Sequence, residues 1–197
     1  MAYKFTEEIL KESLTYKSYR ELIDKLLSEG KTTGENQSPE MIEYTRLNIQ
    51  RMNRNDKTAE IDEELKGLVK SKQHWVIISE AWCGDAANTV PVIAKMADYA
   101  ENVKHHIILR DDNSQIMDEY LTNGARSIPV LIVLDENYNE LFVWGPRPKE
   151  LQSLVMEFKK RAEFDLEELK KNVQMWYLKD KSLSTQKEII NLLKEVK

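Results

Sequence analysis

The chain contains a single cysteine, Cys83, among its 197 residues. One cysteine cannot form a disulfide within its own chain, so the protein is not stabilised by an internal disulfide. For the same reason, any redox chemistry at this thiol requires a second sulfur that comes from another molecule.

The chain also has little glycine or proline and no long apolar run. It has 6 Gly and 5 Pro, with 41% hydrophobic and 32% charged residues, which is typical of a globular protein rich in helix. No apolar run approaches the roughly 18 residues of a membrane span, and the first residues lack the apolar core of a secretory signal. We therefore expect a cytoplasmic protein without a membrane partner.

An excess of positive charge is absent as well. The formal net charge of -5 at pH 7 disfavours nucleic acid as a partner. One local run is basic, with Arg46, Arg51, Arg54 and Lys57 on a predicted helix. Such a run is usually a solvated helix face, and the alternative is a site for an anion such as the carboxylates of glutathione.

The N-terminal part is predicted to be helical. Thr6 is suited to cap a helix whose apolar residues recur at helical spacing up to Gly30, where the helix should end. Ser38 followed by Pro39 predicts the start of a second helix. A further helix is expected over residues 61–69.

After residue 70 the pattern changes to alternating strands and helices. Apolar β-branched runs predict the strands, and apolar residues at helical spacing predict the helices. The expected strands span residues 75–78, 106–109, 130–134 and 141–144, and the expected helices lie near 90–97, 116–121 and 149–161. This order predicts a mixed α/β unit.

Two more helices are predicted at the C-terminal end. Asp165 with Glu168, and Thr185 with Glu188, have the spacing of a capping box ahead of an apolar helical stripe.

The segment around the cysteine, Trp82-Cys83-Gly84-Asp85-Ala86, lies between a predicted strand and a helix start. A sulfur placed there meets unpaired backbone N–H groups and the positive end of the helix dipole, which favours the thiolate. The Asp85 carboxylate opposes this effect because it is a second negative charge nearby. Taken alone, a lone cysteine in such a chain is more often a small buried hydrophobe than a nucleophile.

In context, the segment resembles the active-site segment of thioredoxins, in which Trp-Cys-Gly-x-Cys is usual. Pro91 follows Cys83 by eight residues, at the position of the proline that kinks the thioredoxin active-site helix. Ile128-Pro129 resembles the cis-proline loop, and Gly145 follows that proline at the matching distance of sixteen residues. The resemblance covers roughly residues 74–161.

The resemblance implies an α/β thioredoxin-like fold, with a central mixed β-sheet flanked by helices and with helical N- and C-terminal extensions. Residues 71–162 would form the thioredoxin-like domain. Residues 1–70 would form the N-terminal extension, and residues 163–197 a C-terminal extension that packs on the same unit.

The resemblance also implies an activity, that of a monothiol thiol–disulfide oxidoreductase in cell redox homeostasis, with Cys83 as the catalytic thiol. The substrate would be a disulfide-containing or thiol protein or peptide. Its contacts would come from Trp82, Gly84, Asp85, Ile128 and Pro129. No cofactor is expected, apart from glutathione as a co-substrate.

Two positions depart from the thioredoxin pattern. Ala86 replaces the resolving cysteine, and Ile77 stands where thioredoxins bury an aspartate. Without an internal resolving thiol, glutathione or another external thiol must release the mixed disulfide. The alternative function is a non-catalytic binding module that keeps the scaffold and recognises a protein or peptide through the cis-proline loop.

The three histidines do not predict a metal site. His105 and His106 are adjacent on a predicted strand and point to opposite faces, and His74 has no cysteine or acidic partner at ligand spacing. We expect these histidines at the surface or at strand ends.

Overall fold

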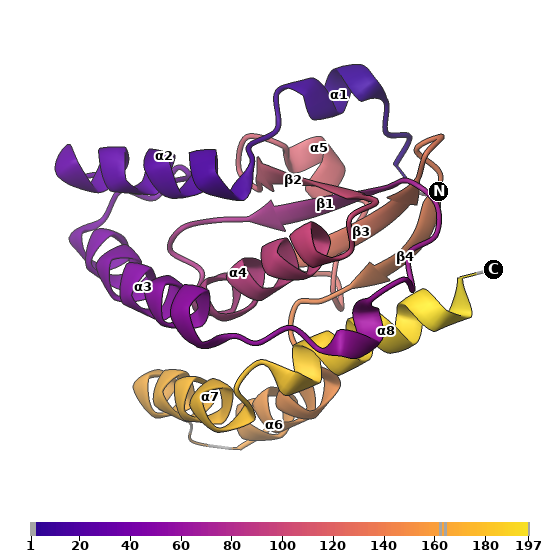
Figure 1. Cartoon of the computed structure of the whole chain (residues 1–197). Coiled ribbons are helices and arrows are strands. Elements are labelled where there is room, and N and C mark those ends of the chain that lie inside the picture. Colours follow the sequence, from indigo (N-terminus) through magenta and orange to yellow (C-terminus); the bar gives the residue numbers. More distant parts are fainter. Residues whose placement is uncertain (1–2, 162, 164, 197) are drawn as a thin grey trace.

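A four-stranded mixed sheet lies at the centre of the computed structural model, which describes residues 3–161, 163 and 165–196 (Figure 1). The strands are β1 (Gln73–Ser79), β2 (Val103–Leu109), β3 (Val130–Asp135) and β4 (Glu140–Trp144), in the order β2-β1-β3-β4. Strand β1 pairs parallel with β2 and antiparallel with β3, and β3 pairs antiparallel with β4. The mixed α/β architecture predicted from the sequence is confirmed.

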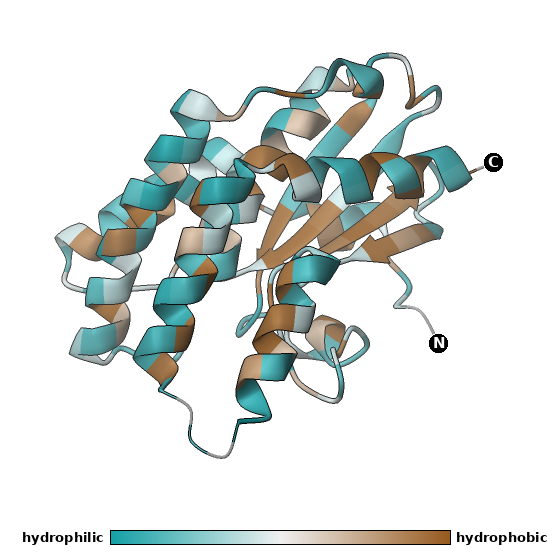
Figure 2. Cartoon of the chain, turned by 90° about the horizontal axis from the view of Figure 1, so that it is seen from below, coloured by the Kyte–Doolittle hydropathy of each residue, from teal (hydrophilic) through white to brown (hydrophobic). Residues whose placement is uncertain are grey.

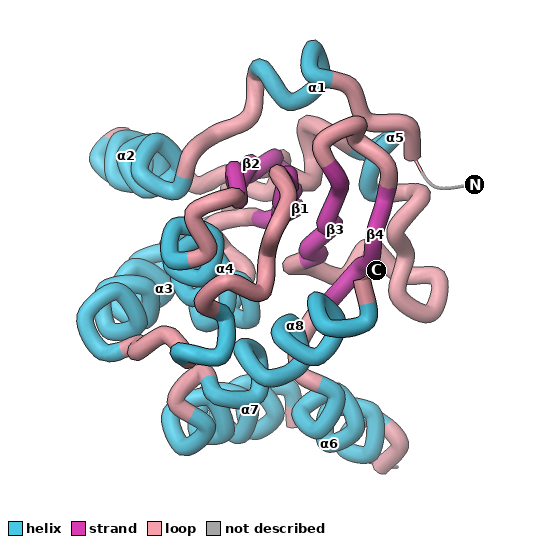
Figure 3. The backbone as a smooth tube through the Cα atoms, turned by 45° about the vertical axis from the view of Figure 1, so that its right-hand side comes forward, coloured by secondary structure: helices cyan, strands magenta, loops and turns pink. Residues whose placement is uncertain are grey.

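Helices surround this sheet in layers. They are α1 (Glu7–Lys11), α2 (Tyr16–Ser28), α3 (Pro39–Thr58), α4 (Gly84–Tyr99), α5 (Ser114–Met117), α6 (Lys149–Lys159), α7 (Leu166–Asp180) and α8 (Leu183–Glu195). Helices α4 and α8 lie against one face of the sheet, and α3, α7 and α6 form an outer layer beyond them (Figures 1 and 3). Within the residues described, no helix is long and apolar enough to cross a bilayer.

Three helices begin at residues that the sequence predicted as caps. Thr6, Ser38 and Asp165 are the N-caps of α1, α3 and α7, and each side chain accepts a backbone N–H from the first turn of its helix. These bonds satisfy N–H groups that have no partner inside the helix.

The first predicted helix is divided into α1 and α2, so the prediction of one continuous helix up to Gly30 is wrong. Between them, Leu14 forms an antiparallel bridge with Ile107 of β2. The Leu14 N–H donates to the Ile107 carbonyl at 2.8 Å, and the Ile107 N–H donates back at 2.7 Å. Pairing with the edge of the sheet therefore overrides the helical periodicity, and Thr15 caps the new helix.

Two further helix predictions are wrong. Residues 61–69 contain only a short 3-10 turn, Glu63–Leu65, because Gln186 of α8 hydrogen-bonds both the Asp62 N–H and the Glu60 carbonyl, each at 2.9 Å. The last helix begins at Leu183, so Thr185 is a buried residue inside it and not its cap.

Among the residues described, the buried apolar side chains form two separate clusters. The main core combines the sheet and α4 with side chains from both terminal extensions, among them Phe5, Tyr19, Met52, Ile189, Ile190 and Leu193. The smaller cluster consists of Leu151, Val155, Phe158, Leu169 and Tyr177, all from α6 and α7. Figure 2 shows the strands as largely hydrophobic and the helices as hydrophobic on part of their surface. Helices α6 and α7 therefore share a small core of their own, which we call the α6–α7 cluster.

Candidate functional site

The only cysteine lies directly beyond β1, at the N-cap of α4. The Sγ of Cys83 accepts a hydrogen bond from the Ala86 N–H at 3.4 Å and donates one to the backbone carbonyl of Ile128 at 3.2 Å. The peptide bond between Ile128 and Pro129 is cis, and β3 begins at the next residue. The fold thus brings together the thiol and the proline loop that the sequence placed 45 residues apart.

Two buried asparagines of α3 hydrogen-bond backbone carbonyls before and within the first turns of α4. Pro91 lies inside α4 and cannot donate to the Ala87 carbonyl as another residue would. The Nδ2 of Asn55 donates to that carbonyl at 3.4 Å and to the Asn88 carbonyl at 3.2 Å. The Nδ2 of Asn48 donates to the Ala81 carbonyl at 2.7 Å, so α3 fixes the chain on both sides of Cys83.

The thiol itself is enclosed and keeps its proton. Cys83 is only 8% exposed. Burial raises the pKa of the Cys83 thiol to about 12, and the charge of Asp85 raises it further, while backbone N–H groups and Arg147 oppose the shift. The helix start favours the thiolate, as the sequence suggested, but burial outweighs it.

The neighbouring Asp85 is held by two side chains from distant parts of the chain. Arg147, in the loop after β4, donates to the Asp85 carboxylate through Nε at 3.1 Å and also through Nη2. The hydroxyl of Tyr177, from α7, donates to Asp85 Oδ1 at 2.9 Å. Burial and the Asp85 charge raise the pKa of Tyr177, so its hydroxyl remains a donor.

Sequence reasoning missed Arg147 and Tyr177. They lie 62 and 92 residues from Asp85, so no local spacing connects them with it. The only local signal was the segment Gly145-Pro146-Arg147-Pro148, in which two prolines restrict the backbone around a basic side chain.

The two other predicted contact residues of the motif are also covered by neighbouring segments. The guanidinium of Arg110 lies over the indole of Trp82, 4.6 Å from the ring centroid. A Cβ atom added to Gly84 would lie 3.1 Å from the Tyr44 hydroxyl and 3.2 Å from Gln174 Nε2. These two side chains come from α3 and α7, so the helical extensions close in on the motif from both sides.

The predicted substrate ledge is closed as well. Ile128 is 5% exposed and Pro129 is buried. The six predicted site residues therefore lie together, as Cys83 with its flanking motif and the proline loop. Cys83, Asp85, Ile128 and Pro129 are buried while Trp82 and Gly84 are half-buried, so the site is shut around the thiol.

The basic run of α3 turns partly toward this site. Arg54 donates to Asn88 Oδ1 at 2.7 Å, and Arg51 donates to Asn48 Oδ1 at 2.6 Å. Arg46 forms an exposed ion pair with Glu43. Arg46 is therefore solvated, as expected for a charged helix face, whereas Arg54 contacts α4 directly and Arg51 orients an asparagine that contacts the chain before α4.

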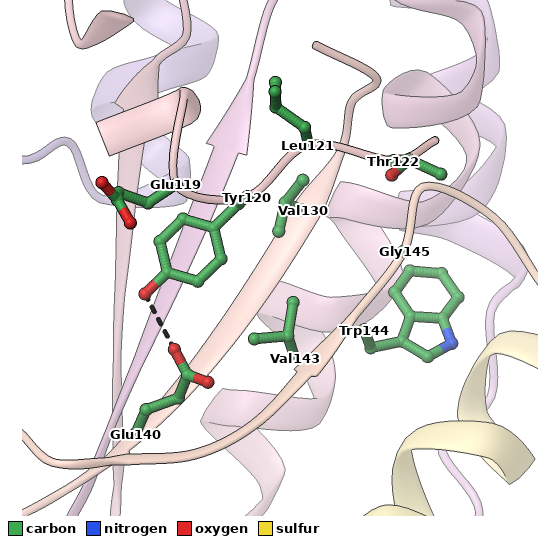
Figure 4. Close-up of a pocket in the computed structure, with 9 residues that line it drawn as sticks. All are labelled: Glu119, Tyr120, Leu121, Thr122, Val130, Glu140, Val143, Trp144 and Gly145. Carbon is green, nitrogen blue, oxygen red and sulfur yellow. Dashed lines mark hydrogen bonds between the residues drawn. The ribbon is translucent and has the colours of Figure 1, made fainter. Parts of the chain in front are cut away.

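Two hollows lie near these elements. One, of about 190 Å³, borders Gly84 and Asp85 and lies between α3, α6 and α7. The other, of about 440 Å³, lies beside the edge strand β4, where the Tyr120 hydroxyl donates to Glu140 at 2.8 Å (Figure 4). The second hollow is lined by other residues than those predicted for the site.

The histidines lie at the opposite end of β1 from Cys83, and two of them, His74 and His106, belong to a hydrogen-bonded chain. His74 Nδ1 and His106 Nε2 are 3.1 Å apart, and His106 Nδ1 lies 2.8 Å from the Ser13 hydroxyl, which donates to the Leu10 carbonyl at 2.5 Å. His106 is buried in the middle of β2, so the prediction of a position at the surface or at a strand end is wrong for this histidine. Among the residues that the structure covers, no cluster of three or more His, Cys, Asp or Glu side chains could hold a metal ion.

Solved structures share this architecture. An HIV epitope scaffold matches with a TM-score of 0.60 and 14% identity over 100% of both chains. A protein of unknown function from Pseudomonas aeruginosa matches with a TM-score of 0.59 and 12% identity, over 100% of this chain and 99% of its own. At these identities the likeness concerns the fold.

Sequence comparisons give a family. No curated protein matches the chain. The family model described as thioredoxin matches residues 34–188, which include α3, α7 and part of α8 as well as the sheet. With its mixed sheet, helical flanks and terminal helices, the chain has an α/β thioredoxin-like fold and belongs to the thioredoxin family.

Proposed function

We propose that this protein is a monothiol thiol–disulfide exchange protein that uses Cys83 together with an external thiol. The Cys83 thiolate attacks one sulfur of a disulfide, that S–S bond breaks, and the other sulfur leaves as a thiolate that takes up a proton. A second, external thiolate then attacks the mixed disulfide, forms a new disulfide with the substrate sulfur, and releases Cys83.

The observation that carries this proposal is the position of the sulfur. Cys83 Sγ lies at the N-cap of a 16-residue helix, accepts the Ala86 N–H, and faces the Ile128 carbonyl beside Pro129. In this position, a substrate disulfide that extended along the Ile128-Pro129 backbone would lie next to the nucleophile, and backbone N–H groups would stabilise the thiolate.

The same surroundings determine what the cycle needs. Ala86 supplies no resolving thiol, so an abundant small thiol such as glutathione must complete the exchange. A reducing compartment provides such thiols, and we therefore place the protein in the cytoplasm. Because burial raises the pKa of Cys83 to about 12, the resting thiol is unreactive and the site must open before the first step.

The proposal is tested by incubating the purified full chain with glutathione disulfide at pH 8 and following its intact mass. The wild-type protein should gain one glutathione over hours, and reduced glutathione should remove it. Cys83→Ser should gain none, because the hydroxyl is not a nucleophile toward disulfides. A wild-type chain that stays unmodified in excess disulfide would show the proposal to be wrong.

The buried, neutral thiol favours one second candidate, a binding module without turnover. Here Cys83 would serve as a small core residue whose S–H group donates to Ile128. Such a module would keep its partner when Cys83 is replaced by serine, whereas the exchange protein would lose its covalent complexes.

A further inference from the structure

We propose that helices α6 and α7 form a lid over the Cys83 motif and that Tyr177 and Gln174 of α7 are its latch. This inference rests on the thiol site proposed above, since it explains how that site is shut at rest and which contacts must break to open it. The lid consists of the two helices α6 (Lys149–Lys159) and α7 (Leu166–Asp180), and the body is the sheet with α3, α4 and α8.

The lid has an apolar core separate from that of the body. Its buried side chains form the α6–α7 cluster, while the main core is built from the sheet, α4, α8 and the N-terminal segment. Figure 3 shows α6 and α7 in the outer layer, farther from the sheet than α4 and α8. A pair of helices with its own core can move as one unit without exposing the main core.

Polar contacts connect α7 to the start of α4. The Tyr177 hydroxyl donates to Asp85 Oδ1 at 2.9 Å, and Gln174 Oε1 accepts from Asn88 Nδ2 at 2.9 Å. Gln174 also lies against Gly84, the residue after the cysteine. Two hydrogen bonds thus hold α7 on the motif, and water can replace both of them when the helix moves away.

The seam between lid and body is not fully packed. The hollow of about 190 Å³ beside Gly84 and Asp85 is also lined by Val155 of α6 and by Leu169 and Val173 of α7. Lid and body do not touch across this hollow, so the seam has fewer contacts to lose on opening than a continuously packed interface has.

A joint lies at the C-terminal end of the lid. Lys181 and Ser182, between α7 and α8, both have left-handed backbone angles, with φ of 53° and 67°. Such angles are unfavourable for residues other than glycine and are typical of hinge and switch positions. Because α8 is anchored in the main core, rotation at this joint would move α7 relative to the body.

The lid reaches the residues beside the thiol. Tyr177 of α7 and Arg147, in the loop just before α6, both donate to the carboxylate of Asp85, two residues after Cys83. Opening would bring water to the sulfur and remove the burial that keeps it protonated. The open state would therefore contain the reactive thiolate.

The test measures the rate at which Cys83 reacts with iodoacetamide, a neutral alkylating agent, at pH 8. Tyr177→Phe keeps the ring of the α6–α7 cluster and removes the hydroxyl that binds Asp85. It should react about tenfold faster than wild type. The substitution removes a hydrogen bond to a charged group that exists only in the closed state, so the closed state is destabilised and the open state is populated more often. Gln174→Ala should react several-fold faster as well.

Matched controls separate the latch from general effects of the substitutions. Tyr99→Phe and Gln50→Ala change the same residue types at exposed positions of α4 and α3. Both controls should react at the wild-type rate.

Low concentrations of urea distinguish lid opening from global unfolding. Opening exposes little surface, so the alkylation rate should change little up to about 1 M urea, whereas a route through global unfolding responds steeply. Two results would contradict the lid proposal. One is a wild-type alkylation rate in both latch variants, and the other is a faster alkylation rate that rises steeply with urea. Alkylation requires no disulfide substrate, so this result is independent of the glutathione experiment.

Discussion

At the scale of single residues, a backbone contact next to the proline loop leaves no space for a side chain at Gly145. This glycine has φ of 130°, and a Cβ placed on it would lie 2.4 Å from the Pro129 carbonyl oxygen. The neighbour is backbone and cannot move aside as a flexible side chain could. The contact sets the distance between the loop after β4 and the loop before β3.

Gly145→Ala should therefore lower the free energy of unfolding by about 3 kcal/mol or more, through the clash and the unfavourable backbone angle. Gly124→Ala is the matched control, because Gly124 also has a positive φ, 76°, but has nothing within 4 Å of the added atom. Its loss should be about 1–2 kcal/mol. Urea unfolding of both variants measures the difference, and equal losses would contradict the role of the close contact.

Single residues also show what the sequence could predict of the site. Cys83, Trp82 and the Ile128-Pro129 loop were predicted because each belongs to a short local pattern. The partners of Asp85 were not, because a buried carboxylate can be paired from anywhere in the fold and its neighbours are set by tertiary packing. The protonation state of the thiol could not be predicted for the same reason, because burial of the sulfur depends on the tertiary packing of the helices around it.

At the scale of elements, the segment from α1 to α2 is fastened to β2 by three contacts. They are the backbone bridge between Leu14 and Ile107, the contact of His106 with Ser13, and the Tyr16 N–H that donates to His105 Nε2 at 3.1 Å. Burial lowers the pKa of His106 to about 4, and the nearby charges of His74 and Lys104 act in the same direction. In the unfolded chain this pKa is near 6.5.

Stability should therefore fall on acidification. Between pH 6.5 and pH 4 the unfolded chain binds a proton at His106 that the folded chain does not, so folding becomes less favourable as the pH falls through this range. The loss from this group should reach about 1–2 kcal/mol at pH 5. Urea unfolding at pH 7.5 and pH 5 measures it. His106→Gln should lose less stability between these two values, and an equal loss would assign the pH dependence to other groups.

Local capping signals placed three helix starts correctly and one, Thr185, wrongly, and boundaries that depend on distant contacts were predicted poorly. The caps Thr6, Ser38 and Asp165 act through their own helix, and all three were identified. The break before α2 and the extended course of residues 61–69 depend on β2 and on Gln186, which the local sequence does not reveal. Helix α5 also ends earlier, at Met117, than the predicted end near residue 121.

At the scale of the whole molecule, the thioredoxin-like unit and its extensions share one core. Tyr19 and Met52 from the N-terminal side and Ile189 and Ile190 from the C-terminal side are almost fully buried in it. The segment 71–162 therefore lacks part of the apolar surface that covers its sheet.

The isolated fragment 71–162 should accordingly not fold as a cooperative unit, because removing the extensions would expose several large side chains worth roughly 1.5–3 kcal/mol each. Thermal unfolding followed by circular dichroism provides the measurement, with the full chain as the control that shows a single transition. A sharp transition in the fragment would show that the extensions are dispensable for the core.

The burial of Cys83 has a consequence for how the protein withstands oxidants. Peroxides oxidise thiolates, and a sulfur that is 8% exposed and keeps its proton offers them neither charge nor access. Two copies also cannot join their sulfurs while both sites are shut. The protein should therefore survive storage in air with its single thiol intact, and irreversible damage would be confined to the brief periods when the sulfur meets water.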